Sequence, residues 1–101
     1  IFVSSGAAVS RAAYWGPYSV SKAGLEALVV TYAHEVENTP VRANLINPGP
    51  TRTNMRAKAF PGENAASLKT PESIAPTFVK LAEAACTDNG KIFDLKTGDV
   101  R

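Results

Sequence analysis

The chain has 101 residues, of which 45% are hydrophobic and 20% are charged, a balance that fits one small globular domain and excludes a disordered or fibrous protein. Its net charge is only +2 and its basic residues are scattered without forming a stripe or block, so nothing indicates a nucleic-acid partner. No apolar run approaches the roughly 18 residues that span a bilayer, and the single cysteine cannot form an internal disulfide, so the default expectation is a cytoplasmic protein without a membrane or metal partner.

The first four residues predict a buried β-strand, which the chain enters at Ile1 without a preceding turn or cap. We therefore expect residues 1–101 to form a single partial domain, a fragment of a longer protein. Residues 5–16 are rich in Ser, Ala and Gly and indicate a loop at the carboxyl end of this strand. Chemistry in parallel sheets gathers at such ends.

A long helix is predicted from Pro17 to about Glu37. Proline suits a first helical position, strong helix formers follow it, and the run Asn38-Thr39-Pro40 has to end the helix. Two apolar lines follow the helix, one of larger and one of smaller side chains: Leu25, Val29, Tyr32 and Val36, and Ala23, Ala27 and Val30. A helix with two apolar lines needs two packing partners.

The second half of the chain repeats the strand-then-helix pattern. A short strand is predicted at 41–46, closed by the two prolines and the glycine of 47–50. Residues 50–70 form a connection of a length typical of lids and binding loops. Thr70 caps a second helix that begins at Pro71 and runs to about Ala85, and a turn at 88–90 leads into a third strand at 91–95.

This alternation of strands and helices predicts an α/β fold with three parallel strands and two main helices. A sheet that starts so abruptly leaves the edge of its first strand unpaired, which again favours missing upstream strands.

Three side chains that can move a proton at a carbonyl group are Ser5, Tyr18 and Lys22. Tyr18 and Lys22 are four residues apart on the predicted helix, so they share one face with Cβ atoms about 5 to 6 Å apart, and the ammonium can act on the phenol. Ser5 stands thirteen residues before Tyr18, a spacing that favours it over the adjacent Ser4.

These residues, followed in order by Asn47-Pro48-Gly49 and Thr53, resemble the short-chain dehydrogenase/reductase family. The resemblance covers nearly the whole chain and corresponds to the C-terminal half of that family. It implies the C-terminal part of a Rossmann-like doubly wound sheet. Residues 14–18 and 44–56 look most like an oxoacyl-reductase-like branch.

The resemblance implies an NAD(P)-dependent oxidoreductase that reduces a small carbonyl compound or oxidises an alcohol, with NADP or NAD as its cofactor. Tyr18 would be the general acid or base, and Lys22 would favour the phenolate and hold the ribose hydroxyls. Ser5 would donate a hydrogen bond to the substrate oxygen.

Further cofactor contacts are implied in the loop after the second strand. Pro48 and Gly49 would let this loop pass close to the nicotinamide. The Thr51 backbone and the Thr53 side chain would contact its carboxamide or the phosphates. The family's Gly-rich turn, ribose-reading residue and catalytic Asn do not occur in this chain. We therefore expect the isolated chain to bind the cofactor poorly and to be inactive alone.

Simpler interpretations stay open. Tyr18 and Lys22 could form a surface helical pair, and Ser5 and Thr53 could satisfy their own backbone. The second apolar line of the long helix favours a homo-oligomer formed through that helix, as the resemblance also implies, although upstream helices could cover it instead. The alternative function is a non-catalytic interaction or dimerisation module.

Overall fold

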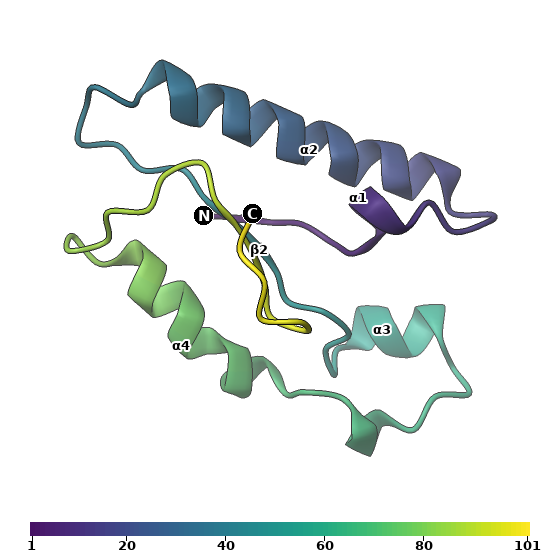
Figure 1. Cartoon of the computed structure of the whole chain (residues 1–101). Coiled ribbons are helices and arrows are strands. Elements are labelled where there is room, and N and C mark those ends of the chain that lie inside the picture. The colour runs from purple at the N-terminus through teal and green to yellow at the C-terminus, as the bar shows by residue number, and fades with distance from the viewer.

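The computed structural model describes residues 1–101, and a three-stranded parallel sheet lies at its centre (Figure 1). The strands lie in the order of their labels: β1 (Phe2–Val3), β2 (Leu45–Asn47) and β3 (Ile92–Asp94). Phe2 lies opposite Leu45, which in turn lies opposite Ile92. The predicted α/β fold with three parallel strands is confirmed.

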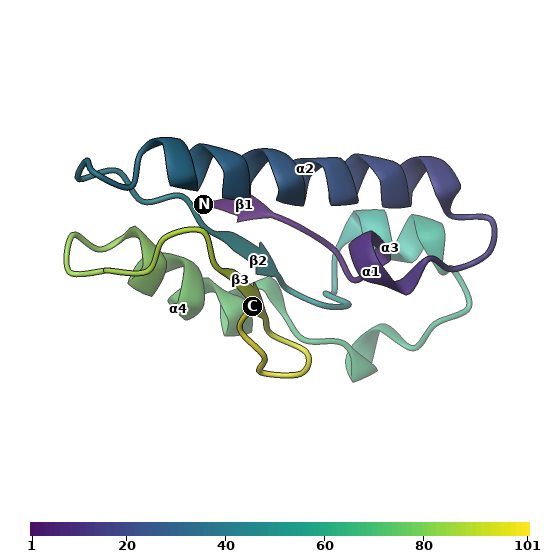
Figure 2. The ribbon, with the colours of Figure 1, turned by 45° about the horizontal axis from the view of Figure 1, so that its top comes forward.

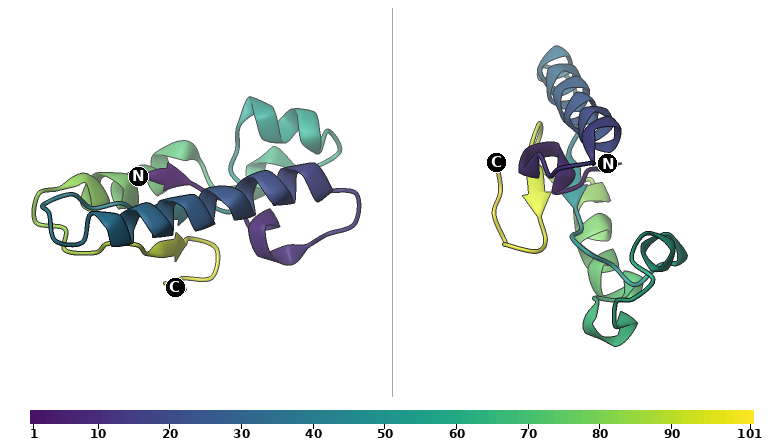
Figure 3. Two further views of the ribbon diagram at one scale, coloured as in Figure 1. Left: turned by 90° about the horizontal axis from the view of Figure 1, so that it is seen from above. Right: turned by 90° about the vertical axis from the view of Figure 1, so that its right-hand side faces the viewer.

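The two main helices, α2 (Gly16–Glu35) and α4 (Pro71–Ala82), lie on opposite faces of this sheet (Figures 1 and 3). Each has a proline in its first turn, where the fixed φ angle suits a helix and the missing N–H is not needed. The predicted cap of α4 is present, because the Thr70 side chain accepts the backbone N–H of Ser73 at 3.3 Å. Both helices end two or three residues earlier than predicted.

The core of the protein is thin. It is one cluster on α2 and the sheet: Val29, Ala33, Ala43, Leu45 and Ile92. Only 11 of the 101 residues are buried, and the radius of gyration of 14.6 Å exceeds the roughly 13 Å of a compact domain of this length. Much apolar surface is therefore uncovered.

The buried face of α2 differs from the predicted one. Its buried residues are Glu26, Val29 and Ala33, with Leu25 and Val30 packed beside them. Tyr32 was expected in the buried line but is 43% exposed, and Ala23 and Ala27 also face solvent. The sheet covers a single side of the helix, so Ala23 and Ala27 of the second apolar line have no partner in this chain, whereas Val30 packs beside the core.

The strand predicted at 1–4 is present as β1, but its side chains are not buried. Ile1, Phe2 and Val3 are 42 to 44% exposed, because β1 is an edge strand with β2 as its neighbour. On the far side of the sheet, the C-terminal segment doubles back onto β3. Val100 forms an antiparallel bridge with Phe93, and Arg101 exchanges both backbone hydrogen bonds with Ile92.

Two predicted loops contain short helices. Residues 5–16 include α1 (Ala7–Ser10), which packs against α2. The connection at 50–70 includes α3 (Asn54–Ala59) and the 3-10 helix η1 (Ala65–Ser67). None of these three helices has a buried residue, and a helix without a buried face does not need the apolar periodicity by which helices are predicted. No helix of the protein combines the length and the apolar character needed to cross a membrane.

Candidate active site

The predicted site residues lie where the parallel strands end. Ser5 follows β1, and Pro48 and Gly49 follow β2, so all three are at the carboxyl edge of the sheet. The first turns of α2, with α1 and α3 beside them, reach the same region (Figure 2). The topology thus brings Tyr18 and Lys22 to the edge that carries Ser5.

Lys22 connects the helix to the strand. Its Nζ donates a hydrogen bond of 3.0 Å to the backbone carbonyl of Val3, two residues before Ser5. The same nitrogen lies 5.7 Å from the centroid of the Tyr18 ring. One of the three N–H groups of the ammonium serves the carbonyl, and two remain for other acceptors.

The two adjacent serines have different environments. The Ser4 side chain is buried and donates a 2.6 Å hydrogen bond to Oε1 of Glu26. Ser5 is half-buried, and its Oγ accepts the backbone N–H of Ala7 at 3.2 Å. This contact leaves the hydroxyl proton of Ser5 available to a further acceptor, whereas that of Ser4 is committed.

Tyr18 is the start of an aromatic row that leads into the 50–70 connection. The Trp15 ring meets the Tyr18 ring edge-on, with centroids 5.7 Å apart, and stacks on the Phe60 ring at 5.9 Å. The Arg56 guanidinium lies 3.7 Å from the Phe60 centroid and is held by two hydrogen bonds to Glu63, of 2.8 and 2.9 Å. The connection therefore reaches the first turn of α2 through Phe60.

This ion pair shifts both of its partners. The hydrogen bond from Arg56 lowers the pKa of Glu63, and the same bond raises the pKa of Arg56. Both changes favour the charged forms that hold the segment together.

Side chains of the sheet shape the loop after β2. The backbone N–H of Gly49 donates to Oδ1 of Asn47 at 3.1 Å, and Nδ2 of Asn47 donates to Asp94 at 3.0 Å. Gly49 has a φ of +71°, and a Cβ there would lie 3.2 Å from Cβ of Lys96. Glycine is thus required on two counts, conformation and space.

Asp94 anchors this loop from β3. Partial burial raises the pKa of its carboxyl group, but hydrogen bonds from the backbone N–H groups of Thr97 and Lys96 and from the Asn47 amide outweigh that effect. The pKa of Asp94 therefore lies below its ordinary value.

The two threonines of the loop make local contacts. Thr51 donates from its hydroxyl to the Gly49 carbonyl at 3.0 Å. Thr53 is the N-cap of α3, and its Oγ1 accepts the backbone N–H of Arg56 at 3.1 Å. A shallow cavity of about 210 Å³ lies beside Pro48 and Gly49, and Lys69 and Lys96 contribute to its lining.

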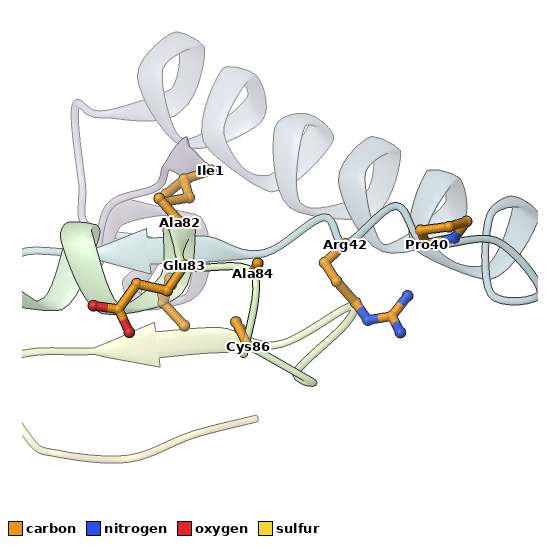
Figure 4. A pocket seen from close by; sticks show the side chains of 8 residues that line it. Ile1, Pro40, Arg42, Ala82, Glu83, Ala84 and Cys86 are labelled. Carbon is orange, nitrogen blue, oxygen red and sulfur yellow. The ribbon is translucent and has the colours of Figure 1, made fainter.

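A larger cavity, of about 530 Å³, lies at the opposite edge of the sheet (Figure 4). Its lining includes Ile1, which precedes β1, and Arg42, which precedes β2. It is therefore at the amino ends of the strands and does not belong to the candidate site.

Sequence reasoning missed two features of the site. Glu26, a charged residue of the predicted long helix, is buried at the end of β1, where it accepts the Ser4 hydroxyl. The contact between Trp15 and Phe60 joins positions far apart in the chain, and no local pattern indicates it.

A parallel sheet between two layers of helices, with a serine, a tyrosine and a lysine gathered at its carboxyl edge, defines a Rossmann-like α/β protein. The model of the short chain dehydrogenase family matches residues 1–64. The chain belongs to the short-chain dehydrogenase family, as the resemblance of its motifs predicts.

Curated relatives support this assignment. The chain is 39% identical over 99 residues to the oxidoreductase YciK of Escherichia coli (strain K12), a match that covers 97% of this chain and 39% of the relative. It is 34% identical over 110 residues to a benzil reductase ((S)-benzoin forming) of Bacillus subtilis (strain 168), covering 93% of this chain and 45% of that protein. The chain thus spans less than half the length of these relatives.

Solved structures show the same fold. A short chain dehydrogenase from Salmonella enterica serovar Typhi superposes with a TM-score of 0.87 at 41% identity, over 94% of this chain and 40% of that one. One from Escherichia coli CFT073, in complex with NADPH, superposes with a TM-score of 0.86 at 40% identity, over the same shares of the two chains.

Proposed function

We propose that this protein is an NADP(H)-dependent oxidoreductase that reduces a carbonyl group or, in the reverse direction, oxidises an alcohol. The observation that carries the proposal is the position of Lys22. Its ammonium is bound to the end of β1 at Val3 and lies beside the Tyr18 ring. A cation, a phenol and the strand end that carries Ser5 are thereby gathered at one edge of the sheet.

The roles of the side chains follow from their chemistry. Tyr18 gives its phenolic proton to the carbonyl oxygen, and Ser5 donates a hydrogen bond to the same oxygen as negative charge develops there. The positive charge of Lys22 favours the phenolate that Tyr18 leaves behind. When bound, the nicotinamide would supply the hydride for the carbonyl carbon, or accept it in the reverse reaction.

The donor set fits this cofactor. The two N–H groups of Lys22 that remain free of Val3 suit the adjacent hydroxyls of a ribose. Gly49 allows the loop after β2 to approach a flat ring closely, with Pro48 beside it and Thr51 and Thr53 following as further contacts. Relatives of this fold bound to NADPH and to NADP support the phosphorylated form of the cofactor.

The test uses the protein expressed from its complete reading frame, which includes these 101 residues. Tyr18→Phe removes one hydroxyl and should lower kcat for NADPH-dependent ketone reduction by at least about a hundredfold, within the range of general acid catalysis, while NADPH binding changes little. Tyr32→Phe, the same chemical change on the outer side of α2, is the matched control and should keep its rate. Equal rates for Tyr18→Phe and the unmodified protein would refute the assigned proton donor.

We also propose that the protein self-associates through the outer side of α2 and works in the cytoplasm. Val20 and Leu28 are 73% and 67% exposed there, and a symmetric helix pair would cover both. The lone free Cys86 fits a reducing compartment. In analytical ultracentrifugation, Leu28→Lys should dissociate the assembly, and an unchanged sedimentation coefficient would count against this surface.

The same exposed side of α2 favours a second candidate function, a non-catalytic association module. The two candidates differ in what the reading frame encodes. A Gly-rich strand-to-helix turn before Ile1 supports the enzyme, and a reading frame that begins near Ile1 supports the module.

A further inference from the structure

A buried carboxylate stands one helical turn beyond Lys22. Glu26 is 8% exposed, and its Oε1 accepts the 2.6 Å hydrogen bond from the Ser4 hydroxyl, itself on a residue 3% exposed. Nη2 of Arg101 donates to both carboxylate oxygens, at 3.0 and 3.1 Å. We call these three residues the Ser4–Glu26–Arg101 clamp.

The clamp has little to offer as a source of stability. Removing a charge from water costs several kcal/mol, and apolar side chains of similar volume at such a position are often equally stable or more stable. What a buried polar group does provide is direction, because each hydrogen bond is satisfied in one alignment only. The clamp therefore specifies how α2 and β1 are aligned.

The clamp lies next to the candidate catalytic residues. Two side-chain bonds cross from α2 to the end of β1: Lys22 reaches the Val3 carbonyl, and Glu26 receives the Ser4 hydroxyl. They join consecutive residues of the strand to consecutive turns of the helix. Ser5 directly follows Ser4 in the chain, and Tyr18 lies one turn before Lys22 on the helix, so each candidate catalytic side chain adjoins a residue that one of the two bonds holds.

From this juxtaposition we infer that Ser4 and Glu26, supported by Arg101, are positioning residues that hold Ser5 and Tyr18 toward one substrate oxygen. The inference rests on the proposed function. A slip of one residue in β1 would move Ser5 by about 3.3 Å and turn its side chain to the other face of the sheet. Misplacement by about 1 Å can already cost about a hundredfold in rate.

The decisive variant is the double replacement Ser4→Ala with Glu26→Leu. It removes both partners of the buried hydrogen bond together, which leaves stability nearly unchanged. The half-exposed Arg101 side chain can turn to solvent. We expect kcat to fall about ten- to a hundredfold, KM for NADPH to change less than about twofold, and Tm to stay within a few degrees.

Two controls separate positioning from stability. Glu35→Gln alters an exposed carboxyl group on the same helix and should change neither kcat nor Tm. Val29→Ala opens a cavity in the core and should lower Tm without a selective loss of kcat. If Val29→Ala lowers kcat as much as the double variant does, the clamp acts through stability alone and the inference is overturned.

A readout without turnover tests the alignment of β1 and α2 separately from the proposed reaction. The Ala8 backbone N–H donates to the Ser5 carbonyl at 3.0 Å, so its hydrogen exchange reports on the order of this turn. Exchange at Ala8 should be several-fold faster in the double variant and unchanged in Glu35→Gln. If both the exchange at Ala8 and kcat are unaltered in the double variant, the positioning role of the clamp is refuted. If instead Tyr18→Phe keeps its full kcat while exchange at Ala8 is faster in the double variant, the proposed reaction is refuted and the positioning role stands.

Discussion

Replacing Phe60 by leucine should release the 50–70 connection from the start of α2. No residue of α3 is buried, and the stack of Phe60 on Trp15 is the aromatic contact that joins this connection to the start of α2. An aromatic pair contributes about 0.5 to 1.5 kcal/mol beyond its buried area. The Arg56 cation above the Phe60 ring belongs to the same segment and does not count toward its attachment. An equilibrium between attached and detached α3 should therefore shift roughly two- to thirteenfold toward detachment.

The protein itself carries a probe of this shift, because Trp15 is the one tryptophan of the chain. In Phe60→Leu its emission should move to longer wavelength and its quenching by acrylamide should increase. Met55→Leu, on α3 at a side chain that is 72% exposed, is the control and should leave both signals unchanged. Identical quenching in Phe60→Leu and the unmodified protein would show that the stack does not hold the segment.

Three further predictions concern stability and cofactor binding. Because the folded-state pKa of Asp94 is lowered, the contribution of its carboxylate to stability is fully present above its unfolded pKa of about 3.9 and is lost as pH falls through the folded value. The difference in urea unfolding free energy between the protein and Asp94→Asn should therefore shrink below about pH 4. A constant difference would argue against Asp94 as the anchor of the loop. Leu45→Ala should cost about 2 to 5 kcal/mol in the same assay, against less than about 0.5 kcal/mol for the exposed Val79→Ala, and similar losses at both sites would contradict the placement of the core. The 101-residue chain alone should bind NADPH weakly in calorimetric titration, and micromolar affinity would contradict that expectation.

Features with local chemical signals could be predicted from the sequence. Pro17 marks the start of the long helix because proline suits a first turn, and Thr70 caps α4 through a contact three residues away. Helices α1 and α3 could not be predicted, since four and six residues are too few to display a helical period. The order of Ser5, Tyr18 and Lys22 predicted the family, and the matches to known proteins confirm it.

The burial of a side chain depends on which remote segments pack against it, and the predicted buried face of α2 was wrong. Tyr32 and Val29 look equivalent in the pattern of the helix, yet the sheet covers only Val29. The burial of Glu26 could not be predicted, because the partner that makes it acceptable, Arg101, is remote in sequence. The roles of Ser5, Tyr18 and Lys22 in catalysis stay predictions until the variants are measured.

The two edges of the sheet differ in whether a further strand can pair with them. Residues 95–101 already occupy the outer flank of β3, whereas β1 offers its outer peptide groups to whatever polypeptide comes next. A strand that paired with β1 would donate a hydrogen bond to the Val3 carbonyl, the same oxygen that accepts the hydrogen bond from Lys22. A carbonyl has two lone pairs, so a strand added beside β1 could bond the Val3 oxygen without displacing Lys22.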